Sequence, residues 1–248
     1  MKENIYTIPV IDAFKEDTEC PLCHLYMKLE KESIDFMLGP SYMEDDIRME
    51  TNKIGFCSHH YGKMYEEKNR LGLALMLHTH LEEINKNLSK IISSNKDLNS
   101  KSSSIFNVFK TGKNNPSTKN ENPISSYLNK VYEGCYICNK IDNTFKRYID
   151  TFFYLWKSDE SFVSLVSEGK GFCLKHFSLL LEKGSQLLNK NQYTHFTQIV
   201  IPIQQKNLKR IEEELDWFIQ KFDYRFKDEP WGNSKDAIPR SLLKIASL

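Results

Sequence analysis

The sequence predicts an all-α fold made of two pseudo-repeated helical units. Apolar residues recur at helical spacing, the same cysteine–histidine pattern occurs twice, and turn residues interrupt both copies at a corresponding place. We therefore expect each unit to begin as a helical hairpin that a metal site closes, with a long amphipathic helix following it.

The duplicated pattern is a CxxC motif followed by a Gly-Phe-Cys-x-x-His motif. Between the second cysteine of CxxC and the cysteine of the second motif lie thirty-three residues in the first copy and thirty-four in the second. We expect one ligand set in each copy, and together the sets use all six cysteines of the chain. The first set is Cys20, Cys23, Cys57 and His60, and the second is Cys135, Cys138, Cys173 and His176.

Three thiolates and one imidazole form the ligand set of a closed tetrahedral zinc site. We therefore expect two zinc ions per chain, each in a saturated and hence structural Cys3His site with a net charge of −1. Two alternatives stay open, because a CxxC pair is also the dithiol of thioredoxin-type redox proteins and thiolates also bind iron–sulfur clusters.

Several histidines compete for a role in these sites. His59 lies beside His60, but only His60 keeps the spacing that the second copy shows. Cys20 to His24 matches the CxxCH pattern of haem attachment. The second copy has Asn139 in place of that histidine, and a haem would leave Cys57 without a role.

Each CxxC is expected to start an outgoing helix of about 15 residues, which spans roughly 22 Å at 1.5 Å per residue. Gly39-Pro40-Ser41 ends the first of these helices and Lys157-Ser158-Asp159 the second. A returning helix of about ten residues would cover most of that distance. The hairpin would thus bring CxxC and GFCxxH of the same copy together, and Gly-Phe-Cys would open the next helix.

Two long apolar stripes are expected to lie in the core of the helical bundle. Their residues are Leu77, Leu81, Ile84, Leu88 and Ile91 in the first half, and Leu208, Ile211, Leu215, Phe218, Phe222 and Phe226 in the second. Between the halves, residues 93–123 are rich in Ser, Asn and Lys, which is typical of a flexible linker. We therefore expect metal-binding units at 1–92 and 124–248.

The composition is that of a soluble globular protein. Of the 248 residues 40% are hydrophobic and 27% charged, and the formal net charge is +1. No apolar run approaches the roughly 20 residues of a membrane span, and the N-terminus lacks the apolar core of a signal peptide. A cytoplasmic location follows, where thiols stay reduced. The balanced charge argues against a nucleic-acid partner.

With both motifs in view, the sequence resembles an uncharacterised bacterial family of unknown function that is common in clostridia and their relatives. The resemblance is carried by Cys20-Pro-Leu-Cys23, by Gly55-Phe-Cys57-x2-His60, by their second copies, and by the segment Lys235-Asp236-Ala237-Ile238-Pro239-Arg240. It covers nearly the whole chain except the linker. The resemblance implies no activity.

The leading hypothesis for function is a non-enzymatic protein, stapled by two structural zincs, that binds a partner protein or acts in regulation. The competing hypothesis is an enzyme or redox protein whose metal or thiols take part in chemistry. No Gly-rich phosphate loop, HExxH motif or nucleophile elbow is present in the sequence. The sequence alone leaves the question of enzymatic activity open.

Overall fold

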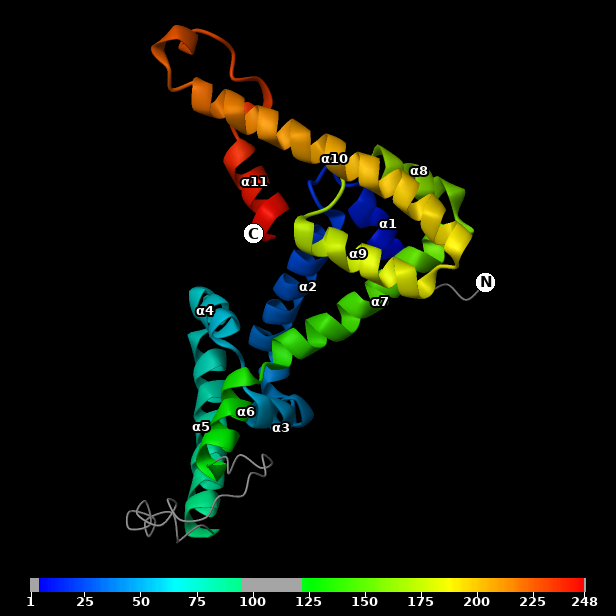
Figure 1. Cartoon of the computed structure of the whole chain (residues 1–248). Helices are drawn as coiled ribbons and strands as arrows, with labels where there is room; N and C mark the ends of the chain where they lie inside the picture. The colour runs from blue at the N-terminus through cyan, green and yellow to red at the C-terminus, as the bar shows by residue number, and fades with distance from the viewer. Residues whose placement is uncertain (1–4, 95–121, 248) are drawn as a thin grey trace, which may run out of the picture. The chain divides into compact units, whose positions relative to one another are not determined.

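The computed structural model describes residues 5–94 and 122–247, and every regular element within these ranges is a helix (Figure 1). The predicted all-α class is confirmed. The α-helices are α1 (Thr7–Lys15), α2 (Pro21–Leu38), α3 (Asp45–Ile54), α4 (Ser58–Glu66), α5 (Arg70–Ser94), α6 (Pro123–Glu133), α7 (Tyr136–Ser158), α8 (Glu160–Glu168), α9 (Leu174–Leu187), α10 (Lys190–Gln220) and α11 (Ala237–Ala246). The 3-10 helices are η1 (Pro40–Met43), η4 (Tyr224–Phe226) and η5 (Gly232–Ser234).

The helices follow the same order in both halves of the sequence. In each half a short helix precedes the CxxC motif, a long helix starts at it, a shorter helix leads to Gly-Phe-Cys, and two more helices follow. The predicted start of a helix directly after Gly-Phe-Cys is confirmed, since α4 begins at Ser58 and α9 at Leu174. Whether the halves superpose stays a prediction.

The two hairpins do not close as predicted. Helix α2 has 18 residues and α3 has 10, which correspond to about 27 Å and about 15 Å. The difference is larger in the second half, where the 23 residues of α7 span about 34 Å and the 9 residues of α8 about 14 Å. The returning helix is therefore too short to bring each GFCxxH back to the CxxC of its own copy.

The chain folds into two compact units whose border falls inside α2 and α7. The first unit consists of Met1–Glu30 and Ile141–Leu248, and the second of Lys31–Lys140. Each unit thus takes segments from both sides of the expected linker, whereas the predicted boundaries 1–92 and 124–248 follow the duplication in sequence. Most of 93–123 lies outside the described residues, and its described ends belong to α5 and α6 or directly precede α6.

An aromatic cluster forms the core of the first unit. Phe152 of α7 is fully buried, and its ring lies 5.5 Å from those of Phe14 and Phe162 and 6.2 Å from that of Phe196. These rings come from α1, α8 and α10, and Phe172 of the Gly-Phe-Cys segment adds another at 6.5 Å. The same core that joins four helices therefore also positions the segment that carries Cys173.

The core of the second unit is smaller and aliphatic. It contains Met37 of α2, Met64 of α4, and Leu73 and Met76 of α5, all at most 4% exposed. The interpretation of the α5 stripe as core is wrong at Leu77 and Leu81, which are 36% and 54% exposed, and the other three residues, Ile84, Leu88 and Ile91, are only half-buried.

The stripe on α10 is likewise only partly buried. Ile211 is 5% exposed, whereas Phe222, just past the end of the helix, is 75% exposed. The first stripe lies on α5, whereas the second lies on α10 only as far as Phe218, because Phe222 and Phe226 come after the end of that helix. Which side chains are buried depends on the neighbouring helices, and these cover less of α5 and of the end of α10 than a full bundle would.

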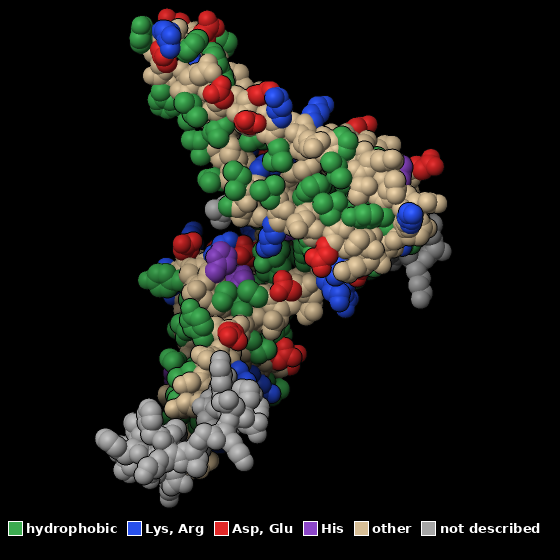
Figure 2. Space-filling view, in the orientation of Figure 1, with side chains coloured by type: hydrophobic (Ala, Val, Ile, Leu, Met, Phe, Trp, Pro, Cys, Tyr) green, Lys and Arg blue, Asp and Glu red, His purple; other side chains and the backbone are tan. Residues whose placement is uncertain are grey.

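Charged side chains of both signs are interspersed over the face that Figure 2 shows, which agrees with a net charge of +1. Among the described residues, no helix combines the length and the apolar character that a bilayer crossing requires.

Candidate metal centres

The eight predicted ligands gather in two groups, but each group draws on both copies of the motif. Site 1 contains Cys20, Cys23, Cys173 and His176, and site 2 contains Cys57, His60, Cys135 and Cys138. Within each group the ligand atoms all lie within 4.8 Å of one another. The predicted sets, Cys20, Cys23, Cys57 and His60 on the one hand and Cys135, Cys138, Cys173 and His176 on the other, are therefore wrong as pairings.

Each site lies entirely inside one compact unit. Site 1 belongs to the first unit and site 2 to the second. In each site the Phe-Cys-x-x-His segment of one copy lies beside the CxxC of the other copy.

Every ligand pair spans the first turn of a helix. Cys57 and Cys173 are the N-cap residues of α4 and α9, and the histidine ligands follow three residues later. The CxxC pairs have the same spacing, with their first cysteine directly before α2 or α7. Residues three apart lie on one face of a helix, so both ligands of a pair point the same way. The partial positive charge of each helix N-terminus also favours thiolates.

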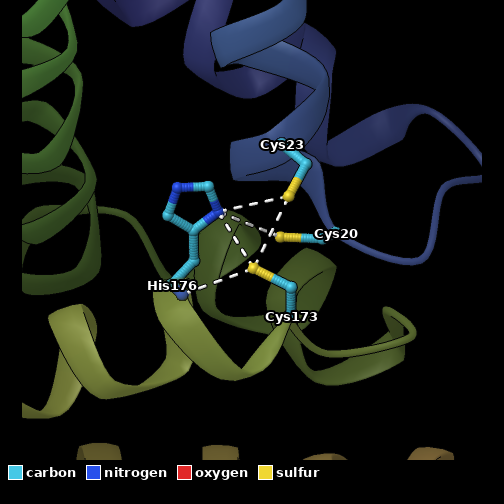
Figure 3. Close-up of side chains that lie close together, drawn as sticks. All are labelled: Cys20, Cys23, Cys173 and His176. Atoms are coloured by element: carbon cyan, nitrogen blue, oxygen red, sulfur yellow. Dashed lines mark hydrogen bonds between the residues drawn. The ribbon is translucent and has the colours of Figure 1, made fainter. Parts of the chain in front are cut away.

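The four side chains of site 1 point toward one another, two from the start of α2 and two from the start of α9 (Figure 3). The His176 Nδ1 atom lies 3.5 Å from the sulfur of Cys20 and 3.3 Å from those of Cys23 and Cys173. The sulfurs of Cys23 and Cys173 are 3.5 Å apart. Zinc bonds of about 2.3 Å to sulfur and about 2.0 Å to nitrogen give tetrahedral edges of roughly 3.5–3.8 Å, so one ion fits among the four atoms.

Site 2 has the same arrangement. The His60 Nδ1 atom lies 3.2 Å from the sulfurs of Cys57 and Cys135 and 3.4 Å from that of Cys138. The sulfurs of Cys57 and Cys138 are 3.8 Å apart. Such spacing is far from a disulfide, and all six cysteines are free thiols. His59 is exposed, so the choice of His60 over His59 from the repeat agrees with the structure.

A glycine with positive φ precedes both Phe-Cys-x-x-His segments. Gly55 has a φ of 68° and Gly171 a φ of 77°, a region that side-chain-bearing residues avoid. A Cβ on Gly55 would lie 2.5 Å from His80 Nε2, and one on Gly171 would lie 2.8 Å from Gln204 Oε1. Both motifs thus need glycine for two reasons: the backbone turn and the close approach of a side chain from the following long helix.

Helix α11 contributes three contacts around site 1 that the motif did not reveal. Lys244 is fully buried, and its Nζ donates to the carbonyl oxygens of Glu19, at 2.7 Å, and Lys170, at 2.5 Å. Ser247 follows the helix, and its Oγ donates to the Cys173 sulfur at 3.1 Å. Burial lowers the pKa of Lys244, while the charges of Glu19 and Cys20 oppose that shift.

An ion-pair network around the buried carboxylate of Glu19 continues from these contacts. The Glu19 carboxylate, 4% exposed, accepts bonds from Arg210 at 2.6 and 2.8 Å and lies 3.3 Å from Lys244 Nζ. Arg240 pairs with Glu214 and, at 2.8 Å, with Asp236. The only hint in the sequence was the segment 235–240 that carries part of the family resemblance, because it contains two of these residues.

The surroundings of site 2 are different. Here the Tyr136 N–H donates directly to the Gly55 carbonyl at 2.9 Å, which joins the CxxC segment to the Gly-Phe-Cys segment. Gly134 makes this approach possible, since a Cβ there would lie 2.5 Å from the Ile54 carbonyl oxygen. Cys57 and Cys138 are half-buried, whereas all four residues of site 1 are buried.

The protein groups alone favour protonated thiols. Burial raises the pKa of Cys20 to about 11 and also raises that of Cys138, and hydrogen bonding to Cys173 raises that of Cys23. The pKa of Cys173 is lowered, because Cys20, Cys23 and His176 hydrogen-bond to its sulfur. A divalent cation would therefore have to displace protons from several thiols, which makes its binding dependent on pH.

Two cavities lie near these segments, and no metal ligand lines either of them. One of about 240 Å³ in the first unit is bounded by residues that include Phe14, Asp17, Val166 and Lys170. Asp17 and Lys170 form an ion pair with each other. The other, of about 610 Å³, lies in the second unit around residues 42–52. Neither cavity gives a substrate direct access to the sulfur atoms.

A model of a family of unknown function, DUF6062, matches residues 1–248. This confirms the expected resemblance to an uncharacterised family, while its bacterial distribution stays an expectation. No curated protein and no solved structure was found to match the chain. The fold and the two sites therefore have to be interpreted from their own geometry.

Proposed function

We propose that this chain, which belongs to the DUF6062 family of unknown function, is a zinc protein with two structural Cys3His sites and a non-enzymatic, partner-binding or regulatory role. The observation that carries the proposal is the double tetrahedral arrangement. In site 1 and again in site 2, three sulfurs and one Nδ1 are spaced as the corners of a tetrahedron around a single ion would be.

Zinc is favoured over an iron–sulfur cluster because of this spacing. The four ligands of a cluster are shared among two or four iron atoms, so some of them lie farther apart than two ligands of one ion. In each site all four ligand atoms lie within 4.8 Å of one another. Here the sulfurs of Cys23 and Cys173 are 3.5 Å apart, a distance that two ligands of one ion share. A single iron with the same ligands is the remaining alternative, since thiolates also bind iron.

A structural role is favoured over catalysis because four protein ligands complete the tetrahedron. A catalytic zinc keeps a position for water or substrate, and neither site leaves one. Each ion would instead join two helix N-termini that are 81 or 150 residues apart in sequence. Thiolate ligands also require reduced cysteines, so we place the protein in the cytoplasm. The competing function, a metal- or thiol-dependent enzyme or redox protein, would need one ligand to leave.

Metal analysis of the purified protein tests this proposal. We expect about two zinc ions per chain by elemental mass spectrometry, and X-ray absorption should give three sulfur ligands and one nitrogen ligand per ion. Labile sulfide together with iron would support the cluster, and an oxygen ligand from water would support an enzyme. A chain that is folded, reduced and free of metal would overturn the proposal.

A further inference from the structure

We propose that α11 is a latch that closes site 1 and ties the retention of its metal ion to the docking of the C-terminal helix. This inference rests on the proposed metal binding at site 1. It assigns Lys244 and Ser247 as positioning residues and makes the two sites unequal, because the described part of site 2 has no corresponding helix. The argument has three steps.

The first step is the bridge that Lys244 makes. Glu19 directly precedes the ligand Cys20, and Lys170 lies three residues before the ligand Cys173. Since Lys244 Nζ donates to the carbonyl oxygens of both, one side chain joins the two segments that supply all four ligands. The amine is fully buried, so water does not compete for these bonds.

The second step is a comparison with site 2, where the corresponding segments are joined to each other by a direct backbone hydrogen bond. There the N–H of Tyr136, the second residue of its CxxC, donates to the Gly55 carbonyl. The matching residue in site 1 is Pro21, which has no N–H to donate. The residue before the CxxC is Gly134 in site 2 but Glu19 in site 1, and only glycine permits the close backbone contact seen in site 2. Lys244 therefore provides a link that the local sequence of site 1 cannot make.

The third step is the conformation of Ser247. Its φ of 63° is the one positive value among the described residues other than glycine, and this region is unfavourable for a residue that carries a side chain. Glycine would end the helix without that cost. Serine at this place puts its hydroxyl on the Cys173 sulfur, and a hydrogen bond to a thiolate is stronger than one between neutral groups.

Metal binding at site 1 and docking of α11 are then thermodynamically linked, so each favours the other. If docking of α11 strengthens the binding of metal at site 1, the bound metal must stabilise the docked helix by the same free energy. Loss of the ion from site 1 should therefore loosen residues 237–247, whereas loss from site 2 should not.

The test follows each cysteine of the full-length zinc protein separately. Alkylation by N-ethylmaleimide in the presence of EDTA, read by peptide mass spectrometry, reports how fast each site opens. We expect Ser247→Ala to raise the labelling rate of Cys20, Cys23 and Cys173 about tenfold, the effect of losing one hydrogen bond to a charged group. Lys244→Met should raise it further, and the cysteines of site 2 should be unaffected in both variants.

Two controls separate the latch from general loosening of the helix. Ser241→Ala removes another buried hydroxyl of α11, which bonds only to the Ala237 carbonyl, and should leave labelling unchanged. Ser247→Gly removes the hydroxyl but relieves the strained backbone, so it should accelerate labelling as alanine does. Serine and alanine carry the same backbone strain at this position, so unchanged labelling in Ser247→Ala would overturn the role of the hydroxyl.

Hydrogen exchange of residues 237–247 completes the experiment. Protection there should fall when site 1 is emptied by Cys20→Ser and should persist when site 2 is emptied by Cys57→Ser. Unchanged labelling of site 1 in both latch variants, equal effects on both sites, or full protection of α11 without metal would each overturn the latch. If the protein holds no metal and EDTA alters no labelling rate, the proposed function fails instead.

Discussion

The exchange of ligands between the copies makes a sharp prediction about double cysteine variants. Cys20→Ser and Cys57→Ser should each reduce the metal content from two ions to one. Because Cys20 belongs to site 1 and Cys57 to site 2, the double variant should contain none. The combination of Cys20→Ser with Cys173→Ser alters a single site and should keep one ion. If each copy closed its own site, these two results would be reversed.

The effect on stability should be large and confined to one unit. Structural zinc contributes roughly 10–16 kcal/mol of apparent binding free energy in small zinc domains, and a whole domain is stable by only about 5–15 kcal/mol. A unit that loses its ion should therefore lose its cooperative unfolding transition. Zinc per chain is measured by elemental mass spectrometry and unfolding by calorimetry. One ion in the double variant Cys20→Ser, Cys57→Ser would refute the pairing.

Three further predictions concern single positions. Gly171→Ala should destabilise the protein by roughly 1–2 kcal/mol in urea unfolding, because φ is positive and an added Cβ would meet a buried side-chain oxygen. The control Gly62→Ala, at an open helix position, should be neutral or stabilising. Asp159 caps α8 through two backbone N–H groups, so alanine there should cost about 1 kcal/mol and asparagine almost nothing. The Ser161 hydroxyl and these N–H groups lower the pKa of Asp159. The contribution of the Asp159 carboxylate to folding stability should therefore be present above pH 3.8 and disappear as the pH falls below it. Unfolding curves of the wild type and the alanine variant at several pH values would show or disprove this dependence. In the metal-loaded protein, half-buried Cys57 should be alkylated faster than fully buried Cys173, and the reverse order would contradict the unequal exposure of the sites.

Local patterns in the sequence predicted the helices and the candidate ligands, but not which candidate ligands share a site. The spacing of apolar residues indicated the helices, and the repeated spacing indicated the eight candidate ligand residues that the structure gathers in two groups, with His60 rather than His59 beside the cysteines. These features depend on residues within a few turns of one another. The pairing depended on the lengths of α2 and α7. Both helices end where the turn residues predicted, but they have 18 and 23 residues instead of about 15, against 10 and 9 residues in the returning helices α3 and α8.

Sequence patterns could not predict the groups around site 1 for a different reason. Lys244 and Ser247 lie more than 70 residues from Cys173 in the chain, and a lysine in an amphipathic helix ordinarily faces solvent. Its burial follows from the docking of α11, which no local signal describes. The segment 235–240 marked the region, but only the structure shows that Arg240 and Asp236 belong to the network that surrounds Glu19.

The loop entropy of the cross-links shows why geometry, and not chain entropy, decides the pairing. Closure within one copy would join Cys23 to Cys57, 34 residues apart, whereas the observed sites join residues 81 and 150 apart. The loop closed by site 2 lies inside the loop closed by site 1, so once site 2 is formed the outer loop has an effective length of about 70 residues. The loop-closure free energy of each site is then only about 0.6–0.8 kcal/mol larger than that of closure within one copy. That gain is small beside the roughly 10 kcal/mol that a structural zinc supplies. A complete tetrahedron is therefore the deciding requirement, and the lengths of α2 and α7 allow one only when each CxxC serves the Phe-Cys-x-x-His segment of the other copy.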